Sequence, residues 1–565
     1  MRRLFLAVTA AMLVAPSAAA GADAIMPLSE VKPGARCTAL TVVHGTTITS
    51  FDVEILDVTD RDRADAARIL IRVSGPAVAA TGIGPGFSGS PIYCPDAAGA
   101  ARNIGAISAG IGEYGGAVGL ATPIETILSE PIQPPSSARR SAPKPSLIGS
   151  RPFTTPLTLS GLSPSIAPIF RRAAKRAGRT LLTSAAAPRA ADFPPQPLVP
   201  GSSVSVGLTS GDIELGALGT VAYADGPNLW IFGHALDSAG RRSLFLQDAY
   251  IHAVVNNPVG APDLSTYKLG AAGNDVGTVT GDGLNAVGAR VGALPPNYPI
   301  KAFARDLDTG RTRTVTTRVA DEGDVGNPAG PSILAVAGSV AVAEAASTVL
   351  RGTPARQSGE MCVKMTLREL KSPIRFCQHY AVDGGGPNAL AGALAADFAQ
   401  AAMPIDSFVY GVLHPTSIEV GLRLRRGMRQ AFLLDATGPS RAKRGQKIKL
   451  RLQLRRTTTG VRLSRTIELK IPRDLDPGMR TIKLAGTDAD EGNDPESEEE
   501  LTILFGDEET PAQPPQSVEE IRDEIEALER YDGVTATIGG RDVRAYRDPN
   551  LRISGDARVE IKIRR

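Results

Sequence analysis

The residues best suited to do chemistry lie in one short stretch, Gly84-Pro85-Gly86-Phe87-Ser88-Gly89-Ser90-Pro91. A serine acts as a nucleophile when it lies on a bend that exposes its hydroxyl, beside backbone N–H groups that stabilise a developing oxyanion. Glycine allows the backbone angles of such a bend, and proline stops it from continuing as a helix. The stretch predicts Ser88 as a nucleophile, with the N–H groups of Gly86 and Ser88 as oxyanion donors. The alternative is a tight connection in a β protein, without chemistry.

A nucleophilic serine needs a general base, and His234 is the histidine best placed for that role. It follows an apolar strand and a glycine in Ile231-Phe232-Gly233-His234. A strand holds such a histidine rigidly, and the glycine lets another segment approach closely. A structural histidine is the alternative. His44, in a predicted hairpin turn, and His252, inside an apolar run, are weaker candidates for the base.

Short strand patterns surround both residues and predict two β modules. The first module, residues 25–130, has apolar or alternating segments on both sides of Ser88 at 38–43, 50–58, 68–73, 92–94, 104–110 and 118–124. The second module, residues 201–330, has such segments at 202–208, 217–223 and 230–232, with Asp225-Gly226 as a hairpin turn. We therefore expect each candidate residue to lie at the end of a strand in its own module.

Two motifs carry a family resemblance. The turn Ser88-Gly89-Ser90-Pro91 and the segment Ala121-Thr122-Pro123-Ile124 resemble the periplasmic HtrA-type proteases. More specifically, residues 26–34 together with Gly86-Phe87-Ser88-Gly89-Ser90-Pro91 are similar to the SpoIVB serine peptidase family. The resemblance implies a chymotrypsin-like double β-barrel. It also implies a base histidine in a Gly-His pair after a strand, followed by a stretch like residues 277–284.

The chain departs from that family in two ways. Ser88 precedes His234, whereas the family's histidine module comes first; a triad depends on geometry, so swapped halves can still assemble one. The family's acidic third member lies shortly before the nucleophile turn, where this chain has Val73-Ser74-Gly75. The site is therefore a Ser–His dyad, or its acid comes from elsewhere. Asp237 and Asp248 are candidates only because they follow His234 closely in the sequence.

The length of 565 residues predicts several domains, and the start of the chain predicts export. Arg2-Arg3 precede an apolar run and then small residues, so residues 1–24 have the pattern of a signal peptide. An uncleaved anchor is the alternative, but the run is short for a span. The four cysteines permit Cys37–Cys94 and Cys362–Cys377 disulfides, each inside one module, with four buried thiols as the alternative.

The remaining segments are assigned from composition and periodicity. Pro, Ser, Ala and Arg dominate residues 131–200, which predicts a linker with one helix at 163–176, basic on one face. The rest is divided into a small α+β unit, an Ig-like β-sandwich, an acidic and Pro-rich linker, and a C-terminal helix with strands, at residues 331–413, 414–486, 487–516 and 517–565. The helix begins at Ser517, and its apolar stripe is expected to pack on terminal strands near Thr535 and 559–563.

The expected fold is mainly β, a double β-barrel followed by the α+β unit and the sandwich. The expected function is a secreted or periplasmic serine endopeptidase of narrow specificity, acting on a protein or peptide. A catalytically weak or inactive protease-like envelope binding protein is the alternative. We expect no cofactor, no metal, no nucleic-acid partner and no membrane span after signal removal; the formal charge of +3 favours no particular partner. The sandwich could contact an envelope partner.

Overall fold

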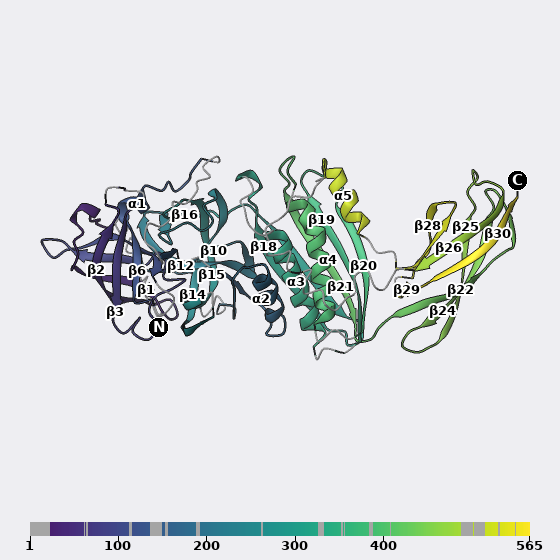
Figure 1. The fold of residues 1–565 in the computed structure, drawn as a ribbon, viewed down its shortest axis with the longest axis horizontal. Coiled ribbons are helices and arrows are strands. Elements are labelled where there is room, and N and C mark those ends of the chain that lie inside the picture. Colours follow the sequence, from purple (N-terminus) through teal and green to yellow (C-terminus); the bar gives the residue numbers. More distant parts are fainter. Residues whose placement is uncertain are drawn as a thin grey trace, which may run out of the picture.

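In a computed structural model, the chain is described over residues 23–564 with internal gaps. Those gaps fall at residues 62, 64–65, 112–115, 136–149, 153–155, 188–192, 262–263, 326–332, 352–353, 355, 384–387, 407, 487–500, 502–514, 529–531 and 549. Most of the expected signal peptide and the acidic segment thus lie outside the described residues. The rest forms an elongated row, with β strands around the N-terminus, a helix-covered sheet in the middle and a separate β unit at the C-terminus (Figure 1).

The first unit is a closed barrel of six strands. Each strand is hydrogen-bonded to the next, and the last, β4, pairs with the first, β1. In order around the barrel the strands are β1 (Arg36–Val42), β2 (Ile48–Thr59), β3 (Arg68–Ser74), β6 (Val118–Pro123), β5 (Ala101–Ile111) and β4 (Pro91–Pro95). A disulfide between Cys37 and Cys94 joins β1 to β4, as predicted. A short β7 (Ser150–Pro152) pairs with β5, and α1 (Ile124–Leu128) follows β6.

A second set of strands also pairs in a ring, because β12 bonds both to β13 and back to β10. The order is β10 (Ser203–Gly207), β14 (Gly240–Ala261), β15 (Leu264–Asp282), β16 (Val287–Val291), β13 (Asn228–Ile231) and β12 (Glu214–Asp225). β8 (Leu157–Ser160) extends this sheet beside β12, and β9 (Leu181–Ser184) pairs with β8. Residues 131–200 are therefore not only a linker, because they contribute two strands to this sheet. Strands of four residues are too short to show the two-residue hydrophobic period in a segment with so many small residues.

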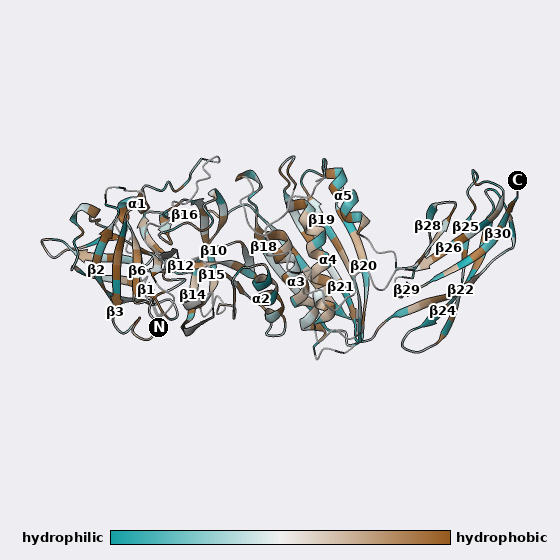
Figure 2. Cartoon of the chain, viewed as in Figure 1, coloured by the Kyte–Doolittle hydropathy of each residue, from teal (hydrophilic) through white to brown (hydrophobic). Residues whose placement is uncertain are grey.

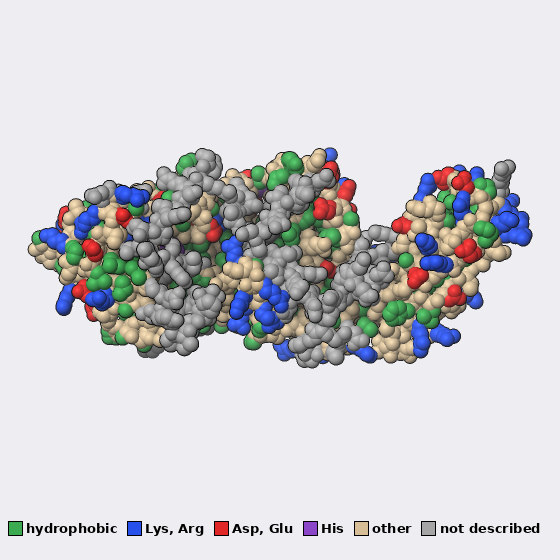
Figure 3. Space-filling view, viewed as in Figure 1, with side chains coloured by type: hydrophobic (Ala, Val, Ile, Leu, Met, Phe, Trp, Pro, Cys, Tyr) green, Lys and Arg blue, Asp and Glu red, His purple; other side chains and the backbone are tan. Residues whose placement is uncertain are grey.

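The helix predicted within that segment is α2 (Ala167–Arg176). Its apolar side chains, including Phe170 and Ala173, are buried in the core, and its last turn carries Lys175 and Arg176. Lys and Arg side chains gather over this helix in the space-filling view (Figure 3). The helix therefore packs on the core by its apolar side, and its basic side chains are exposed.

The middle unit is a six-stranded sheet with two helices packed together on one face (Figure 1). Its strand order is β11 (Thr209–Gly211), β18 (Thr312–Ala320), β17 (Asn297–Asp306), β21 (Pro415–Arg425), β19 (Arg356–Leu367) and β20 (Ile374–Asp383). The helices are α3 (Ile333–Val349) and α4 (Ala389–Asp406), both rich in hydrophobic residues (Figure 2). The predicted disulfide between Cys362 and Cys377 joins β19 to β20. Helix η2 (Gly323–Val325) follows β18.

This sheet includes strands from both neighbouring predicted domains, residues 201–330 and 414–486. β17 and β18 were placed with the His234 module, and β21 with the sandwich, yet β17 and β21 pair in parallel from Ile300↔Ile418 onward. An alternating pattern identifies a strand but not its partner, since both faces of a mixed sheet obey the same period. The α+β unit is thus larger at both ends than residues 331–413.

The C-terminal unit consists of two sheets with a core of their own. One sheet orders as β25 (Arg462–Lys470), β24 (Lys447–Arg456), β22 (Gln430–Thr437) and β29 (Arg552–Ser554). The other orders as β23 (Arg441–Lys443), β30 (Asp556–Arg564), β26 (Gly478–Gly486), β27 (Val534–Ile538) and β28 (Arg541–Tyr546). The predicted alternation of β24 is present, with Ile448, Leu450 and Leu452 buried. The last strands of the chain complete this unit rather than forming a separate one.

Helix α5 (Val518–Ala527) packs on the middle unit, against β20 and α4. Ile521 and Ile525 are buried in that core, and the Gln378 amide donates to the Leu528 carbonyl at 2.8 Å. The expected packing on the terminal strands is therefore wrong, although the Ser517 cap is confirmed, since its hydroxyl accepts from the Glu520 N–H at 3.1 Å. Among the helices in the described ranges, none is long and apolar enough to cross a membrane.

We expect Ile525→Ala to destabilise the middle unit by about 2–5 kcal/mol, because it removes a fully buried side chain and leaves a cavity. Hydrogen exchange followed by mass spectrometry should show faster exchange in β20 and α4 peptides, with the C-terminal sheets unchanged. Glu524→Ala, on the same helix, is the control. Faster exchange in β27 or β30 instead would contradict the packing described.

Candidate catalytic site

Ser88 lies on the turn between β3 and β4, and two glycines shape that turn. Gly86 and Gly89 have φ of +93° and +90°, a region that favours glycine. A Cβ on Gly89 would overlap the carbonyl oxygen of Thr220, and one on Gly86 would lie 2.8 Å from the Cβ of Lys268. The turn is therefore pressed against β12 and β15 of the second strand ring.

Both predicted oxyanion donors are held in place through the carbonyls of their own peptide groups. The Gly86 N–H shares a peptide with the Pro85 carbonyl, which accepts from the Lys268 N–H at 2.9 Å. The Ser88 N–H shares a peptide with the Phe87 carbonyl, which accepts from the Ser90 N–H at 2.9 Å. Within the described part of the chain, neither the Gly86 nor the Ser88 N–H has an acceptor of its own. Two oriented donors beside a serine are what an oxyanion requires.

The Ser88 hydroxyl is a buried group without a hydrogen bond. The residue has no exposed surface, and its Oγ has no partner among the described residues. Its carbonyl, by contrast, accepts from the Thr220 N–H at 2.9 Å, so the backbone is fixed while the hydroxyl is not. Leaving a buried hydroxyl unpaired costs about 1–3 kcal/mol, and native proteins rarely do so without a functional reason.

His234 follows β13 on a bend with unusual backbone angles. Phe232 has φ of +71° and Gly233 φ of +68°. For a bulky residue such as phenylalanine this conformation is strained, and such strain concentrates at functional sites. The Phe232 ring stacks on the His234 ring with centroids 5.8 Å apart, and the Thr122 hydroxyl donates to the Gly233 carbonyl at 2.7 Å.

The Ser88 and His234 bends both contact the backbone of the same two residues, Thr220 and Ile107. The carbonyl of Thr220 accepts from the Phe232 N–H at 3.3 Å, while the Thr220 N–H binds Ser88. The carbonyl of Ile107 accepts from the Gly89 N–H at 2.8 Å and lies 3.2 Å from the position of a Cβ on Gly233. No hydrogen bond joins Ser88 to His234 in this structure.

The His234 ring has the tautomer that a general base needs. Its Nδ1 donates to the carbonyl of Ala235 at 2.6 Å, so the proton is on Nδ1 and the Nε2 lone pair is unoccupied. Nε2 is buried and has no hydrogen-bond partner among the described residues. Burial lowers the pKa of His234 to about 4, with a smaller contribution from the positive charge of Arg68. The imidazole is therefore neutral near pH 7.

A carbonyl thus orients His234 where a carboxylate would in a triad. The two acids considered from the sequence lie elsewhere: Asp237 pairs with Arg242 at 3.3 Å, and Asp248 accepts from the Gln196 and Asn274 N–H groups at 2.8 and 2.6 Å. The competing histidines are also engaged with backbone, since His44 donates to the His252 carbonyl and His252 to the Ala185 carbonyl.

Asp282 is a positioning residue that the sequence analysis did not single out. Its carboxylate accepts from the N–H groups of Leu236, Asp237 and Ala239 at 2.7, 2.7 and 3.0 Å, and so fixes the loop directly after His234. Arg242 lies 4.0 Å from this carboxylate, and Arg242 forms a buried two-point pair with Glu322 at 2.9 Å. The sequence Gly281-Asp282-Gly283 could have indicated this residue, but it entered the prediction only as part of the family resemblance.

Lys268 was not predicted from the sequence either, and the Ser88 turn packs directly against it. It is buried, and its Nζ donates to the hydroxyls of Thr41 and Thr220 at 2.6 and 3.2 Å. The ammonium lies 4.8 Å from the centroid of the Phe87 ring, a cation–π contact. Burial lowers the pKa of Lys268 to about 7. The one sign of it in the sequence is a lysine within a segment of apolar strand residues.

No group of three or more His, Cys, Asp or Glu side chains that could hold a metal occurs in the described ranges. Comparisons with known proteins add no relative: no family model, no curated protein and no solved structure matches the chain.

We expect the His234 imidazole to remain neutral well below pH 6.5 and to gain a proton near pH 4, because its burial disfavours the charged form. The chain has five histidines, so selective ¹³C labelling with an NMR pH titration resolves them, and His234→Gln assigns the signal. A midpoint near 6.5 in the folded protein would contradict the buried, neutral ring.

We expect Lys268→Met to flatten the pH dependence of stability between about pH 7 and 10.5. The folded pKa of Lys268, about 7, is below its unfolded value of 10.5, so the unfolded state binds more protons in this window and wild-type stability rises with pH. The slope lost is about 1.4 kcal/mol per pH unit at most. Urea unfolding at pH 6, 8 and 10 measures it.

Lys32→Met, at an exposed position of the first barrel, is the matched control for that series. Identical slopes for Lys268→Met and wild type would show that Lys268 titrates no differently in the two states.

Proposed function

We propose that the chain is an exported serine endopeptidase of the SpoIVB-like type, with Ser88 as nucleophile and His234 as general base. One observation carries the proposal: Ser88 Oγ and His234 Nε2 are both buried and have no partner among the described residues, and they lie on two bends that meet at Thr220 and Ile107. Unpaired polar atoms of complementary type, one a proton donor and one an acceptor, are the groups that a dyad uses.

The chemistry follows from these atoms. Nε2 of His234 takes the proton of the Ser88 hydroxyl as Oγ bonds to the substrate carbonyl carbon, and the carbonyl oxygen becomes an oxyanion. The free N–H groups of Gly86 and Ser88 stabilise that charge. As the C–N bond breaks, the proton passes from Nε2 to the leaving amine. Water then gives a proton to Nε2 and attacks the acyl carbon, and Nε2 returns that proton to Ser88 Oγ as the ester bond breaks and the carboxylic acid product leaves.

The arrangement of the strands supports the same proposal. A closed six-stranded barrel carries Ser88, and a second ring of strands carries His234, which is the organisation expected of a chymotrypsin-like double β-barrel. The order of the two modules is reversed relative to the SpoIVB type. Both bends are hydrogen-bonded to the backbone of Thr220, so the reversed order is compatible with the proposed site.

The disulfides are consistent with export from the cytoplasm. Two disulfides, Cys37–Cys94 and Cys362–Cys377, persist in an oxidising compartment such as the periplasm or the outside of the cell. We therefore propose a secreted or periplasmic location, reached through the signal peptide at residues 1–24. The substrate is a protein or peptide, and the C-terminal sheets offer a surface for an envelope partner.

We propose a slow enzyme. With a pKa of about 4, His234 is a weak base at neutral pH, and proton-transfer catalysis is most efficient when the pKa is near the working pH. The Ala235 carbonyl orients the ring but carries no full charge to stabilise an imidazolium. Ser88 is also fully buried, so a substrate reaches it only after the residues covering it move. These features fit processing of a narrow set of substrates.

A second candidate is a protease-like envelope binding protein with weak or no activity. The burial of Ser88 and the absence of a carboxylate at His234 favour it. The unpaired state of Ser88 Oγ and of the two oxyanion donors favours the enzyme, because a binding protein gains nothing from them.

We expect a fluorophosphonate probe to label the purified mature protein slowly, and Ser88→Ala to abolish labelling. His234→Ala should reduce the rate by a factor of about 10²–10⁴, the usual contribution of a general base. Labelling is quantified by intact-protein mass spectrometry over hours, beside a known serine protease. Ser90→Ala is the matched control, since Ser90 lies two residues away but its hydroxyl donates to Thr41 at 3.1 Å.

Labelling that survives in Ser88→Ala would place the reactive group elsewhere. No labelling of a folded wild type, under conditions that label the reference protease, would favour the binding protein.

A further inference from the structure

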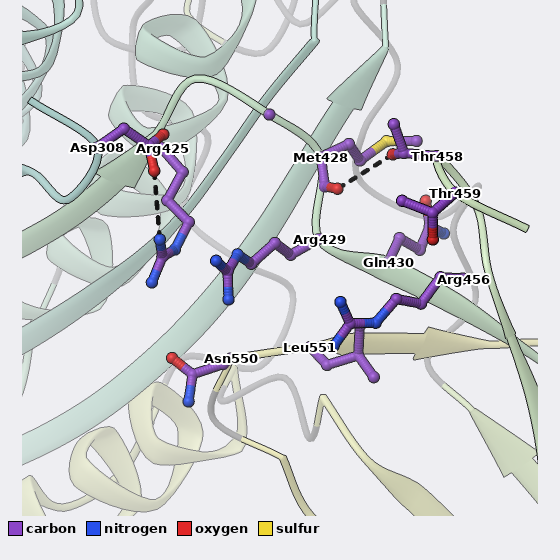
Figure 4. A pocket seen from close by; sticks show the side chains of 11 residues that line it. Asp308, Arg425, Met428, Arg429, Gln430, Arg456, Thr458, Thr459, Asn550 and Leu551 are labelled. Atoms are coloured by element: carbon purple, nitrogen blue, oxygen red, sulfur yellow. Dashed lines mark hydrogen bonds and ion pairs between the residues drawn. The ribbon is translucent and has the colours of Figure 1, made fainter. Parts of the chain in front are cut away.

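A second feature lies about two hundred residues further along the chain, where the middle unit meets the C-terminal sheets. A cavity of 260 Å³ opens there, lined by side chains from both units (Figure 4). Arg425 ends β21, Arg429 lies in the connection to β22, and Arg456 ends β24. Asn550, which precedes β29, contributes an amide to the same lining.

The cavity carries an excess of positive charge. Three arginines and one aspartate line it, so its formal charge is +2. Asp308 pairs with Arg425 at 3.3 Å, but the guanidinium groups of Arg429 and Arg456 have no hydrogen bond or ion pair with any described residue. In the close-up, the Arg425 and Arg429 guanidinium groups point into the same space (Figure 4).

The pKa of Arg429 is consistent with this clustering of positive charges. The pKa of Arg429 is lowered, by partial burial first and then by the positive charge of Arg425, with Arg456 also contributing. Asp308 and Asp548 offset part of this effect. Asp548 is itself engaged with its own loop, because it accepts from the Asn550 N–H at 3.0 Å. An anion between the arginines would relieve the repulsion.

We propose that this cavity binds a phosphate monoester in its dianionic form. A guanidinium group presents parallel N–H donors that match two oxygens of a phosphate, and Arg429 and Arg456 offer two such groups. A dianion balances the formal charge of the lining, whereas a single carboxylate or a phosphodiester balances only half of it. The Asn550 amide, which has no partner among the described residues, supplies a neutral donor.

The connection through this cavity is anchored on the middle unit. Arg426 binds Asp306 at 3.0 Å and the carbonyls of Leu350 and Arg351 at 3.1 and 2.8 Å. Arg456, in contrast, belongs to the C-terminal sheets. A phosphate held by Arg429 and Arg456 therefore links the connection to the C-terminal unit, and the proposal is independent of Ser88 and its chemistry.

Isothermal titration of the full mature protein with inorganic phosphate and with glycerol 3-phosphate tests the proposal. We expect saturable one-site binding of both and about tenfold or greater weakening for each guanidinium removed, in Arg429→Gln and Arg456→Gln, because each removes charged hydrogen bonds. Arg451→Gln, an exposed arginine on β24 outside the cavity, is the control and should bind as wild type. The substituted side chains are not core residues, and circular dichroism verifies folding.

The source of the phosphate is distinguished by a third arm, sedimentation with vesicles of phosphatidic acid in phosphatidylcholine. Binding to these vesicles that Arg429→Gln and Arg456→Gln reduce identifies a lipid phosphomonoester as an accepted ligand, and binding of glycerol 3-phosphate alone identifies a soluble one. Equal binding by wild type and both variants overturns the proposal. So does the absence of phosphate binding by wild type.

Discussion

The backbone of one residue, Thr220, joins the two halves of the candidate site. Its N–H donates to the Ser88 carbonyl and its carbonyl accepts from the Phe232 N–H, so the turn of Ser88 and the bend before His234 are both bonded to this residue. Its hydroxyl donates to the Gly86 carbonyl and accepts from Lys268. The position of Ser88 relative to His234 therefore depends on backbone hydrogen bonds between Thr220 of β12 and the two bends, and these bonds do not change when side chains rotate.

The sequence predicted what is local. The turn at Ser88 and the bend before His234 could be recognised because Gly and Pro restrict the backbone within a few residues. Strands such as β1, β2 and β24 could be recognised because a buried face imposes a period of two. The helix cap at Ser517 is equally local, because its partner Glu520 is three residues away.

What could not be predicted depends on distant partners. Lys268 contacts the Ser88 turn, and Asp282 contacts the loop after His234. Nothing in the residues next to them in the sequence indicates those contacts. The parallel pairing of β17 with β21 joins residues more than a hundred positions apart, and α5 packs on β20 rather than on the strands that follow it. Charge misled in the same way: Asp237 lies near His234 in the sequence but pairs with Arg242.

The order of these parts along the chain has a consequence for biosynthesis. Ser88 belongs to the first barrel, whereas Thr220, His234, Lys268 and Asp282 come from the ring of strands that is made afterwards. The N-terminal barrel is made first, before the residues that hold the Ser88 turn. The turn gains its hydrogen bonds with Thr220 and Lys268 only after β15 has been made and docked against the barrel.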